Sequence, residues 1–399
     1  MLDPQAAEKL IAANLAILPI ESLPVGQCAG AVLRENIYAE RDQPPFDRVA
    51  MDGVALASQA AAAGRRRFRL QATQAAGDAQ ITLASGESCI EVMTGAVLPA
   101  GCDTVVPVEV LHSADGYVDL RDGPAPSAWS NIHRRASDCP QGTLLLPVGA
   151  LLNAPEIAVA ASAGMARVRV SSQPAIVVVS TGNELIEPGD PIAPHQIRRS
   201  NAYAITAALR RRGFQRVADD HVPDDAAQLQ ERLKRHLNTH EVMILSGGVS
   251  MGRFDLVPST LEAIGVKCLL HGISQRPGKP MWYGVSGDGR SVFALPGNPV
   301  STLICLSRYV LPALYRAMGL AATPAERVAL AAPIKWQPPL TGFMPVRIAH
   351  DEWGRPWATP CPTNGSGDFT SLALTDGFVE LAPGPAEFVK GYVCRLYRW

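Results

Sequence analysis

The stretch AIVVVSTGNEL, from Ala175 to Leu185, decides the fold. Its first half is a short, fully apolar run, which is typical of a strand buried on both faces of a parallel sheet. Its second half changes to glycine, hydroxyl, amide and acidic residues, as a loop that leaves the end of a strand does. Because further strands and helices alternate behind it, the sequence predicts an α/β domain with a mostly parallel sheet over residues 173–322.

The other elements of this domain are predicted from apolar runs and helical periodicity. Strands are expected at 214–217, 242–245, 267–270 and 291–295. Helices are expected at 202–212, 224–237, 258–264 and 300–315. Asn201 is the expected N-cap of the first helix, and Asn298 that of the last, with Pro299 at its first position.

The regions on either side of this domain have a different pattern. Short alternating runs separated by Gly or Pro lie between Arg67 and Leu120 and predict a small β lobe. The same pattern after Pro324 predicts a C-terminal β-barrel or sandwich. Periodic apolar residues predict helices at 6–18 and 151–164.

Composition limits the classes of function. A chain of 399 residues is too long for one core, and its 36 Lys+Arg against 37 Asp+Glu give no general attraction for nucleic acid or an anionic membrane. The most apolar stretch, 142–166, contains two prolines and Glu156, so no membrane span is expected. The eight cysteines are scattered, which is typical of reduced thiols in a cytoplasmic protein.

Three loops that follow predicted strand ends have the composition of an anion site. They are STGNEL after Val179, SGGVSMGRFD after Leu245 and PGNP after Leu295. In an open α/β sheet, ligands bind beyond the carboxyl ends of the strands, so the N–H groups of these loops can face a phosphate. Glu184 and Asp255 add carboxylates, which suits a Mg²⁺–nucleotide site. Taken singly, each loop also fits an ordinary strand-end turn.

Two further motifs have a competing interpretation. The loop SQRPGKP carries Arg276 and Lys279, which can face an oxyanion, although a surface turn with solvated charges explains it equally well. GVSMG matches the nucleophile elbow of serine hydrolases around Ser250. The preceding Gly247 and the polar RFD that follows argue against that class.

Several motifs together are similar to one family. In chain order they are PPFDRVAMDGVAL (44–56), MTGAVLPAGCDTVVPVE (93–109), NIHRRASD (131–138), STGNEL, SGGVSMGRFD, RPGKP and LPGNPVS. They resemble the MoeA family of molybdenum-cofactor biosynthesis across nearly the whole chain. SGGVS alone would be weaker, because molybdopterin adenylyltransferases share it.

The resemblance implies a multidomain fold that combines α/β and β architecture. Its parts are a mixed body (1–24 and 138–172), a projecting β lobe (25–137), a three-layer α/β molybdopterin-binding domain (173–322) and a C-terminal β-barrel (323–399). It also implies a homodimer in which each site lies between the α/β and C-terminal domains of one subunit and the β lobe of the other. Transient contact with the adenylyltransferase or with acceptor molybdoenzymes is a further expectation.

The implied reaction inserts molybdenum from molybdate into the dithiolene of adenylylated molybdopterin and releases AMP, with Mg²⁺ as the cofactor. The resemblance assigns a catalytic role to Asp52, Asp138, Glu184, Asp224 and Asp255. We expect Glu184 and Asp255 to hold the metal. The expected substrate-binding residues are Thr94, Ser246, Gly247, Gly248, Ser250, Arg276, Lys279, Pro296, Asn298, Pro299 and Ser371.

The sequence departs from the family pattern in three loops, at Arg48-Val49, at His133 and Ser137, and at Gly272. Arg48 stands where an Asn is common, His133 where an Arg is common, and Gly272 replaces a basic residue. These changes fall in loops that are expected to face the substrate. A specialised paralogue, a non-catalytic scaffold and a molybdopterin adenylyltransferase are therefore the alternatives.

Overall fold

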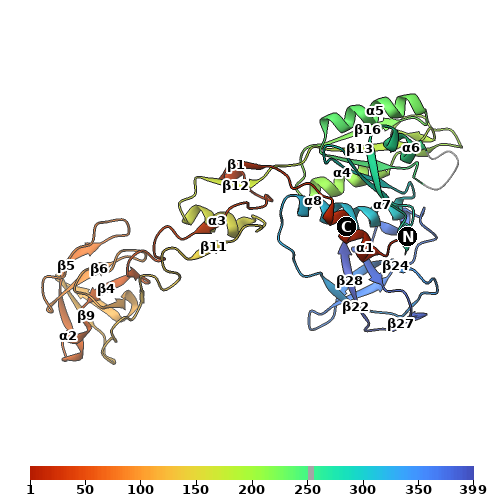
Figure 1. The fold of residues 1–399 in the computed structure, drawn as a ribbon. Coiled ribbons are helices and arrows are strands. Elements are labelled where there is room, and N and C mark those ends of the chain that lie inside the picture. The colour runs from red at the N-terminus through yellow and green to blue at the C-terminus, as the bar shows by residue number, and fades with distance from the viewer. Residues whose placement is uncertain (250–255) are drawn as a thin grey trace. The chain divides into compact units, whose positions relative to one another are not determined.

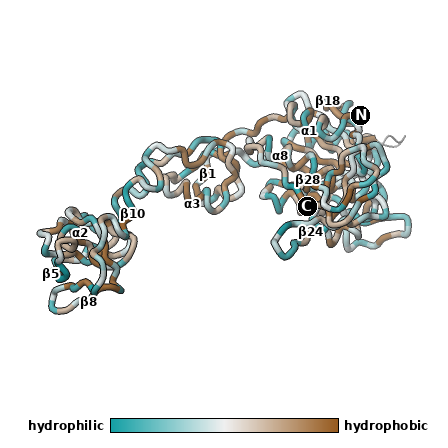
Figure 2. Tube along the Cα trace, turned by 90° about the horizontal axis from the view of Figure 1, so that it is seen from below, coloured by the Kyte–Doolittle hydropathy of each residue, from teal (hydrophilic) through white to brown (hydrophobic). Residues whose placement is uncertain are grey.

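The computed structural model describes residues 1–249 and 256–399 (Figure 1). The chain divides into two compact units. Unit 1 contains Met1–Glu35, Val148–Ala154 and Arg167–Trp399, and unit 2 contains Asn36–Pro147 and Pro155–Ala166. Each unit has its own apolar segments, drawn brown in Figure 2. Among the described residues, no helix is both long and apolar enough to cross a membrane.

Unit 1 is built around a six-stranded sheet in the order β16-β13-β17-β21-β20-β18. The strands are β13 (Ile176–Thr181), β16 (Val217–Val222), β17 (Val242–Ser246), β18 (Val266–His271), β20 (Trp282–Ser286) and β21 (Ser291–Leu295). The first four in the sheet order pair in parallel, while β20 runs antiparallel to both of its neighbours. The predicted mostly parallel α/β domain is therefore confirmed.

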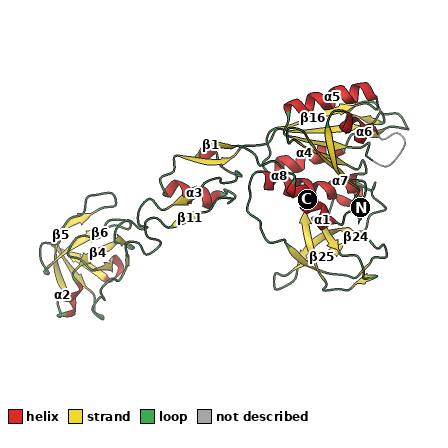
Figure 3. Ribbon diagram, in the orientation of Figure 1, coloured by secondary structure: helices red, strands yellow, loops and turns green. Residues whose placement is uncertain are grey.

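Helices cover both faces of this sheet (Figure 3). They are α1 (Pro4–Ala13), α4 (Asn201–Arg211), α5 (Ala226–Thr239), α6 (Leu256–Ala263), α7 (Pro299–Cys305) and α8 (Leu311–Ala317). Alternate residues of β13 point to opposite faces. Ile176 and Val178 pack in the core that contains residues of α1, α4, α7 and α8, whereas Val177 and Val179 pack with residues of α5 and α6. The result is a three-layer domain.

Three local expectations differ from the structure. The strand predicted at 214–217 is wrong, because β16 begins at Val217 and carries polar residues along the edge of the sheet, where one side needs no apolar partner. Asn201 is the first residue of α4 and Ser200 is its N-cap. The last predicted helix is interrupted between α7 and α8 by a π-helical segment, Leu306–Val310.

The C-terminal part of unit 1 is a closed barrel. Its strands are β22 (Arg327–Leu330), β24 (Thr341–His350), β25 (Pro356–Pro360), β26 (Gly377–Leu381) and β28 (Val393–Arg398). They follow the order β24-β25-β22-β28-β26, and β24 also pairs with β26, which closes the ring. A short strand next to the α/β sheet, β19 (Gln275–Arg276), pairs in parallel with β24 and joins the RPGKP loop to the barrel. The predicted C-terminal β-barrel is confirmed.

Among the described residues, three two-stranded sheets complete unit 1, and one of them joins β14 (Leu185–Ile186) to β15 (Ile197–Arg198). The strand β1 (Ile20–Pro24) pairs antiparallel with β12 (Arg167–Ser171). The sheet between β23 (Ile334–Lys335) and β27 (Glu387–Phe388) extends the barrel region. The predicted division into four domains stays a prediction.

Unit 2 contains a six-stranded sheet in the order β7-β4-β6-β5-β9-β8. Its strands are β4 (Gly53–Leu56), β5 (Arg67–Gln74), β6 (Ser88–Val92), β7 (Thr104–Pro107), β8 (Leu111–Ala114) and β9 (Tyr117–Leu120). Two small ladders join β2 (Ile37–Tyr38) to β11 (Leu144–Leu146) and β3 (Arg48–Val49) to β10 (Ile132–His133). The helices α2 (Ser58–Ala62) and α3 (Ala154–Ser162) lie largely or wholly in this unit.

Candidate active site

A cavity of about 1060 Å³ lies in unit 1 between the α/β sheet and the barrel. The loops after β13, β17 and β21 line it from the sheet, and the RPGKP loop forms another part of its wall. After β13 the chain forms β16, which pairs with one edge of β13, and it then returns to form β17, which pairs with the other edge of β13. The cavity therefore lies at the topological switch point of the sheet, where ligands of open α/β domains bind.

The loop after β17 has a conformation that requires glycine. Gly247 and Gly248 have φ values of +103° and +65°. A Cβ at Gly247 would lie 2.8 Å from the carbonyl oxygen of Thr181, and one at Gly248 would lie 2.7 Å from Cγ2 of Val257. The N–H of Gly247 donates to the carbonyl of Leu295 at 3.2 Å, so this amide supports the neighbouring loop instead of facing an anion.

The cavity wall contains a buried hydroxyl, that of Thr181, which has no hydrogen-bond partner among the described residues. The residue is 5% exposed. A buried hydroxyl without a partner is costly, so its place in a cavity wall indicates a ligand contact. Sequence reasoning placed this residue in the STGNEL loop but did not single it out.

Asn201 connects two of the loops. Its Nδ2 donates to Ser246 Oγ at 2.9 Å and to the carbonyl oxygen of Gly297 at 2.7 Å. Ser246 is buried, and its hydroxyl is used in this contact. The predicted substrate residue Ser246 thus supports the loops and is not among the described residues that line the cavity.

Two carboxylates lie on one side of the cavity. Glu184 and Asp224 both line it, and both are exposed. Asp224 exchanges hydrogen bonds with Asn183: its Oδ2 accepts from the N–H of Asn183 at 3.2 Å, and its own N–H donates to Asn183 Oδ1 at 3.0 Å. Gly182, at φ +141°, gives room to Glu184, since a Cβ there would lie 2.5 Å from Glu184 Oε2.

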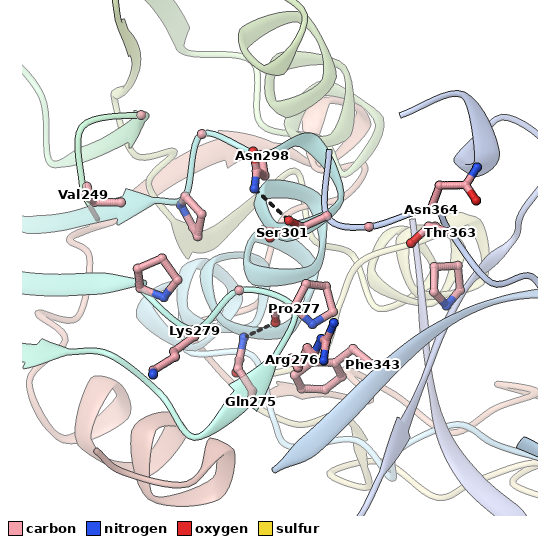
Figure 4. Close-up of a pocket in the computed structure, with 18 of the residues that line it drawn as sticks. Val249, Gln275, Arg276, Pro277, Lys279, Asn298, Ser301, Phe343, Thr363 and Asn364 are labelled. Carbon is pink, nitrogen blue, oxygen red and sulfur yellow. Dashed lines mark hydrogen bonds between the residues drawn. The ribbon is translucent and has the colours of Figure 1, made fainter. Parts of the chain in front are cut away.

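Two cations lie on the RPGKP loop. Arg276 and Lys279 line the cavity, and neither forms an ion pair with another described residue (Figure 4). The sequence analysis left a surface turn with solvated charges as the alternative. Their position on the cavity wall favours the interpretation as an anion-binding loop.

Buried side chains hold the RPGKP loop in place. Gln275 Nε2 donates to the carbonyl of Pro277 at 3.1 Å, the dashed contact in Figure 4, and its Oε1 accepts from the hydroxyl of Tyr309. The thiol of Cys305 donates to the carbonyl of Gly278 at 3.6 Å, and burial raises the pKa of Cys305 to about 12, so it stays a neutral donor. Sequence reasoning missed these residues, which look like ordinary members of a strand and a helix.

The barrel contributes one wall of the cavity, and the residues that form it were not predicted from the sequence. Thr363, Asn364, Gly365 and Ser366 line the cavity. The predicted residue Ser371 is not among the described residues that line it. Its hydroxyl instead donates to the carboxylate of Asp368.

The remaining residues predicted in the α/β domain fall into two groups. Pro296 and Asn298 line the cavity, whereas Pro299 is the first residue of α7, with Asn298 as its N-cap. Ser250 and Asp255 lie outside the described residues. Gly272, at φ +89°, stands where the family pattern has a basic residue, so this position carries no cationic side chain.

The other candidates lie in unit 2, where two of them are in contact. Asp52 Oδ1 accepts from the hydroxyl of Thr94 at 2.7 Å and from its N–H at 2.6 Å. These two donors, the hydroxyl first, lower the pKa of Asp52 below its usual value. Asp52 is exposed, so this carboxylate is charged and oriented but open to solvent.

Two of the departures from the family pattern are also in contact. Arg48 and His133 are partners in the β3–β10 ladder, and Arg48 Nη2 lies 2.9 Å from His133 Nδ1. His133 Nε2 lies 2.8 Å from Asp138 Oδ1. Because a guanidinium only donates, the neutral ring accepts at Nδ1 and donates from Nε2 to the carboxylate.

The chain is similar to known proteins along its whole length. Three family models match it: "MoeA N-terminal region (domain I and II)" over residues 2–164, "Probable molybdopterin binding domain" over 177–316, and "MoeA C-terminal region (domain IV)" over 327–399. A molybdopterin molybdenumtransferase from Synechocystis sp. is 38% identical over 400 residues, covering 100% of both chains. Molybdopterin molybdenumtransferase 2 of Mycobacterium tuberculosis is 31% identical over 80% of each chain.

Solved structures agree with this assignment. A molybdopterin biosynthesis MoeA protein from Pyrococcus horikoshii aligns with a TM-score of 0.80 at 27% identity, covering 100% of this chain and 99% of that one. A second structure of a MoeA protein from P. horikoshii OT3 aligns with a TM-score of 0.83 at 23% identity, which supports the fold. The chain therefore belongs to the MoeA family, a family of transferases in molybdenum-cofactor biosynthesis.

Proposed function

We propose that the chain inserts molybdenum from molybdate into the dithiolene of adenylylated molybdopterin and releases AMP. The observation that carries this proposal is the cavity at the switch point, with the carboxylates of Glu184 and Asp224 and the cations Arg276 and Lys279 on its wall. A substrate with a pyrophosphate and a second, dianionic substrate together need cations, hydrogen-bond donors and a place for a metal.

The proposed reaction balances without a redox partner. Two Mo–S bonds form and one Mo–O bond breaks, and the departing oxide leaves as water with the two thiol protons. A water molecule adds across the pyrophosphate bond, so AMP leaves and the phosphate of the cofactor remains. Molybdenum stays in the +6 state throughout.

Each part of the cavity has a proposed task. Arg276 and Lys279 attract molybdate or the terminal phosphate, because both ligands are anions. The amides of Gly248 and Val249 and the hydroxyl of Thr181 face the substrate from the sheet. Pro296 and Asn298 shape the wall of the pterin pocket.

Magnesium is the proposed cofactor, and its fit rests on the oxygen donors of the cavity. The described residues contain no group of three or more acidic, His or Cys side chains that could hold a metal. Mg²⁺ does not need such a cage, since it keeps several waters and binds through one or two carboxylates plus phosphate oxygens. Glu184 and Asp224 would hold it, together with Asp255 as the sequence predicts. Bound there, it would neutralise charge on the pyrophosphate.

We also propose that the site is shared in a homodimer. Asp52, Thr94 and Asp138 belong to unit 2, and in the proposal they act on the substrate bound to the other subunit. Heterodimers of Asp52→Ala and Glu184→Ala chains are then expected to regain about half of the wild-type turnover per dimer, since one of two sites is intact. Heterodimers as inactive as the two parent homodimers would overturn the shared site.

The function itself is tested by supplying defined substrates. Purified protein is incubated with adenylylated molybdopterin plus molybdate, and AMP and molybdenum cofactor are measured. Separately, it is incubated with molybdopterin plus Mg-ATP, and adenylylated molybdopterin and pyrophosphate are measured. Product from the first mixture alone is expected. Product from the second mixture would identify an adenylyltransferase, and no product from either would favour a scaffold. Lys279→Ala is expected to raise the KM for molybdate in the first mixture.

A further inference from the structure

The barrel loop 361–371 is held in its middle by one carboxylate. Asp368 Oδ2 accepts from the N–H of Asn364 at 2.9 Å, and Oδ1 accepts from the hydroxyl of Thr370 at 2.9 Å and from the N–H of Ser371 at 3.3 Å. The hydroxyl of Ser371 also donates to Oδ2. These donors lower the pKa of Asp368, so the carboxylate is charged and accepts from all of them.

The two ends of this loop are anchored independently of Asp368. At the first end, the N–H of Cys361 donates to the carbonyl of Pro345 at 2.8 Å. At the other end, Leu372 is buried in an apolar cluster with Val300 and Phe343. Between these two ends, the hydrogen bonds to Asp368 tie Asn364 to Thr370 and Ser371.

The middle of the loop also contacts the α/β domain. Ser366 Oγ accepts from Nδ2 of Asn298 at 2.7 Å, and the carbonyl of Ser366 accepts from the N–H of Val300 at 3.1 Å. Figure 4 shows Thr363 and Asn364 on this loop, across the cavity from Val249. The position of the loop thus sets the polar part of the wall that the barrel contributes, beside the apolar part formed by Trp336, Leu340 and Phe343.

The chemistry of this wall differs from that of the RPGKP loop. It presents the neutral hydroxyl and amide groups of Thr363, Asn364 and Ser366, whereas the cations lie on Arg276 and Lys279. Neutral donors and acceptors recognise a polar, uncharged ring, while cations recognise molybdate and phosphate.

We propose that Asp368 is a positioning residue that orders loop 361–371, so that its neutral groups bind the pterin ring of the substrate. The inference rests on the proposed function of the cavity. Asp368 itself is not among the described residues that line the cavity, and it acts through Asn364 and Ser366.

The test compares Asp368→Ala and Asp368→Asn with a matched control, Asp351→Ala. Asp351 holds a turn of the same barrel in the same way, since it accepts from the N–H groups of Trp353 at 3.0 Å and Arg355 at 2.8 Å and from Nε1 of Trp357 at 3.0 Å. None of these residues is among those that line the cavity. The control therefore measures how much KM and kcat change when a similar turn of the barrel is disrupted at a distance from the cavity.

Steady-state kinetics with adenylylated molybdopterin and molybdate give the first readout. In Asp368→Ala the KM for adenylylated molybdopterin is expected to rise about tenfold, with kcat and the KM for molybdate changed less than about twofold. Asp368→Asn, which keeps one acceptor oxygen, is expected to fall between this variant and wild type. An unchanged KM for adenylylated molybdopterin in Asp368→Ala, or an equal rise in Asp351→Ala, would overturn the proposal.

Amide hydrogen exchange gives a readout that needs no turnover. The amides of Asn364 and Val300 are expected to exchange at least about tenfold faster in Asp368→Ala and at the wild-type rate in Asp351→Ala. Unchanged exchange at Val300 would show that Asp368 does not position the loop. If wild-type protein fails to turn over, the proposed function has failed, and the exchange rates still decide whether Asp368 orders the loop.

Discussion

The loops around the cavity in unit 1 and the Asp52–Thr94 pair in unit 2 are held in place by different means. The loops depend on side chains that hydrogen-bond to them, such as the half-buried Asn201 and the buried Gln275, and on glycines whose positive φ disfavours other residues. Asp52, in contrast, is exposed, and among the described residues its carboxylate accepts side-chain and backbone hydrogen bonds from Thr94 alone. The residues that hold the cavity loops therefore also stabilise the fold. Asp52 can be substituted without disturbing the apolar core of unit 2.

The largest loss of turnover and stability is expected from a substitution at Gly247, which tests whether the cavity loops depend on their glycines. Gly247→Ala places a Cβ 2.8 Å from the carbonyl oxygen of Thr181 at a φ of +103°. We expect turnover to fall about 100-fold and the free energy of unfolding to fall by about 2 kcal/mol. Enzyme kinetics and urea unfolding measure the two quantities.

Gly287→Ala is the matched control. A Cβ there meets nothing within 4 Å, and the residue is exposed. Wild-type turnover and stability are expected for this variant. If both variants behaved alike, the glycine requirement after β17 would be disproved.

A smaller effect is expected at Asn201, a half-buried residue that hydrogen-bonds to two of the loops. Asn201→Ala removes the hydrogen bonds to Ser246 Oγ and to the carbonyl of Gly297. We expect a stability loss of about 1 kcal/mol and a rise in KM of about tenfold. Asn14→Ala removes one amide-to-carbonyl contact, from Asn14 Nδ2 to Leu10 at 2.8 Å, away from the cavity, and is expected to leave KM unchanged. A normal KM in Asn201→Ala would contradict the idea that it aligns the two loops.

In unit 2 a substitution at Thr94 is expected to change the pH dependence of kcat/KM more than the stability of the fold. Thr94→Val removes the hydroxyl that donates to Asp52, so the pKa of Asp52 rises toward its ordinary value. The carboxylate then becomes protonated at a higher pH, and the acidic limb of the plot of kcat/KM against pH moves to higher pH. Thr94→Ser keeps the donor and is expected to keep the wild-type profile. An acidic limb that does not move in Thr94→Val would show that Asp52 does not act as a carboxylate in turnover.

The smallest effect is expected at Arg48, which acts through His133. Arg48→Leu removes the donor to Nδ1, so His133 loses its preference for the proton on Nε2, and its contact with Asp138 weakens. Turnover is expected to fall about threefold. ¹⁵N chemical shifts of the His133 ring report the tautomer directly. The same Nε2–H tautomer in wild type and variant would rule out this role for Arg48.

The sequence predicted the features that depend on local pattern. The apolar run 176–179 and the loops that follow the strands were placed correctly, because parallel strands buried on both faces have a strong local signal. The strand β16 was misplaced, because an edge strand carries polar residues such as Asp219 and Asp220. Ser371 was expected at the cavity from the family resemblance, but its hydroxyl donates to the carboxylate of Asp368.

The supports of the site could not be predicted, because their partners are distant in the chain. Asn298 and Ser366 lie 68 residues apart, and Asn201 and Gly297 lie 96 apart. Such polar pairs have no period in the sequence, and each residue alone also fits a cap, a turn or a solvated surface. Only the folded arrangement assigns them a role.

A crystal structure of the protein soaked with molybdate, AMP and Mg²⁺, with a molybdenum anomalous difference map, tests most directly whether the cavity at the switch point is the receptor. An anomalous peak is expected in the cavity, in contact with Arg276 or Lys279. A peak outside the cavity, with neither side chain in contact with molybdate, would contradict the proposed site.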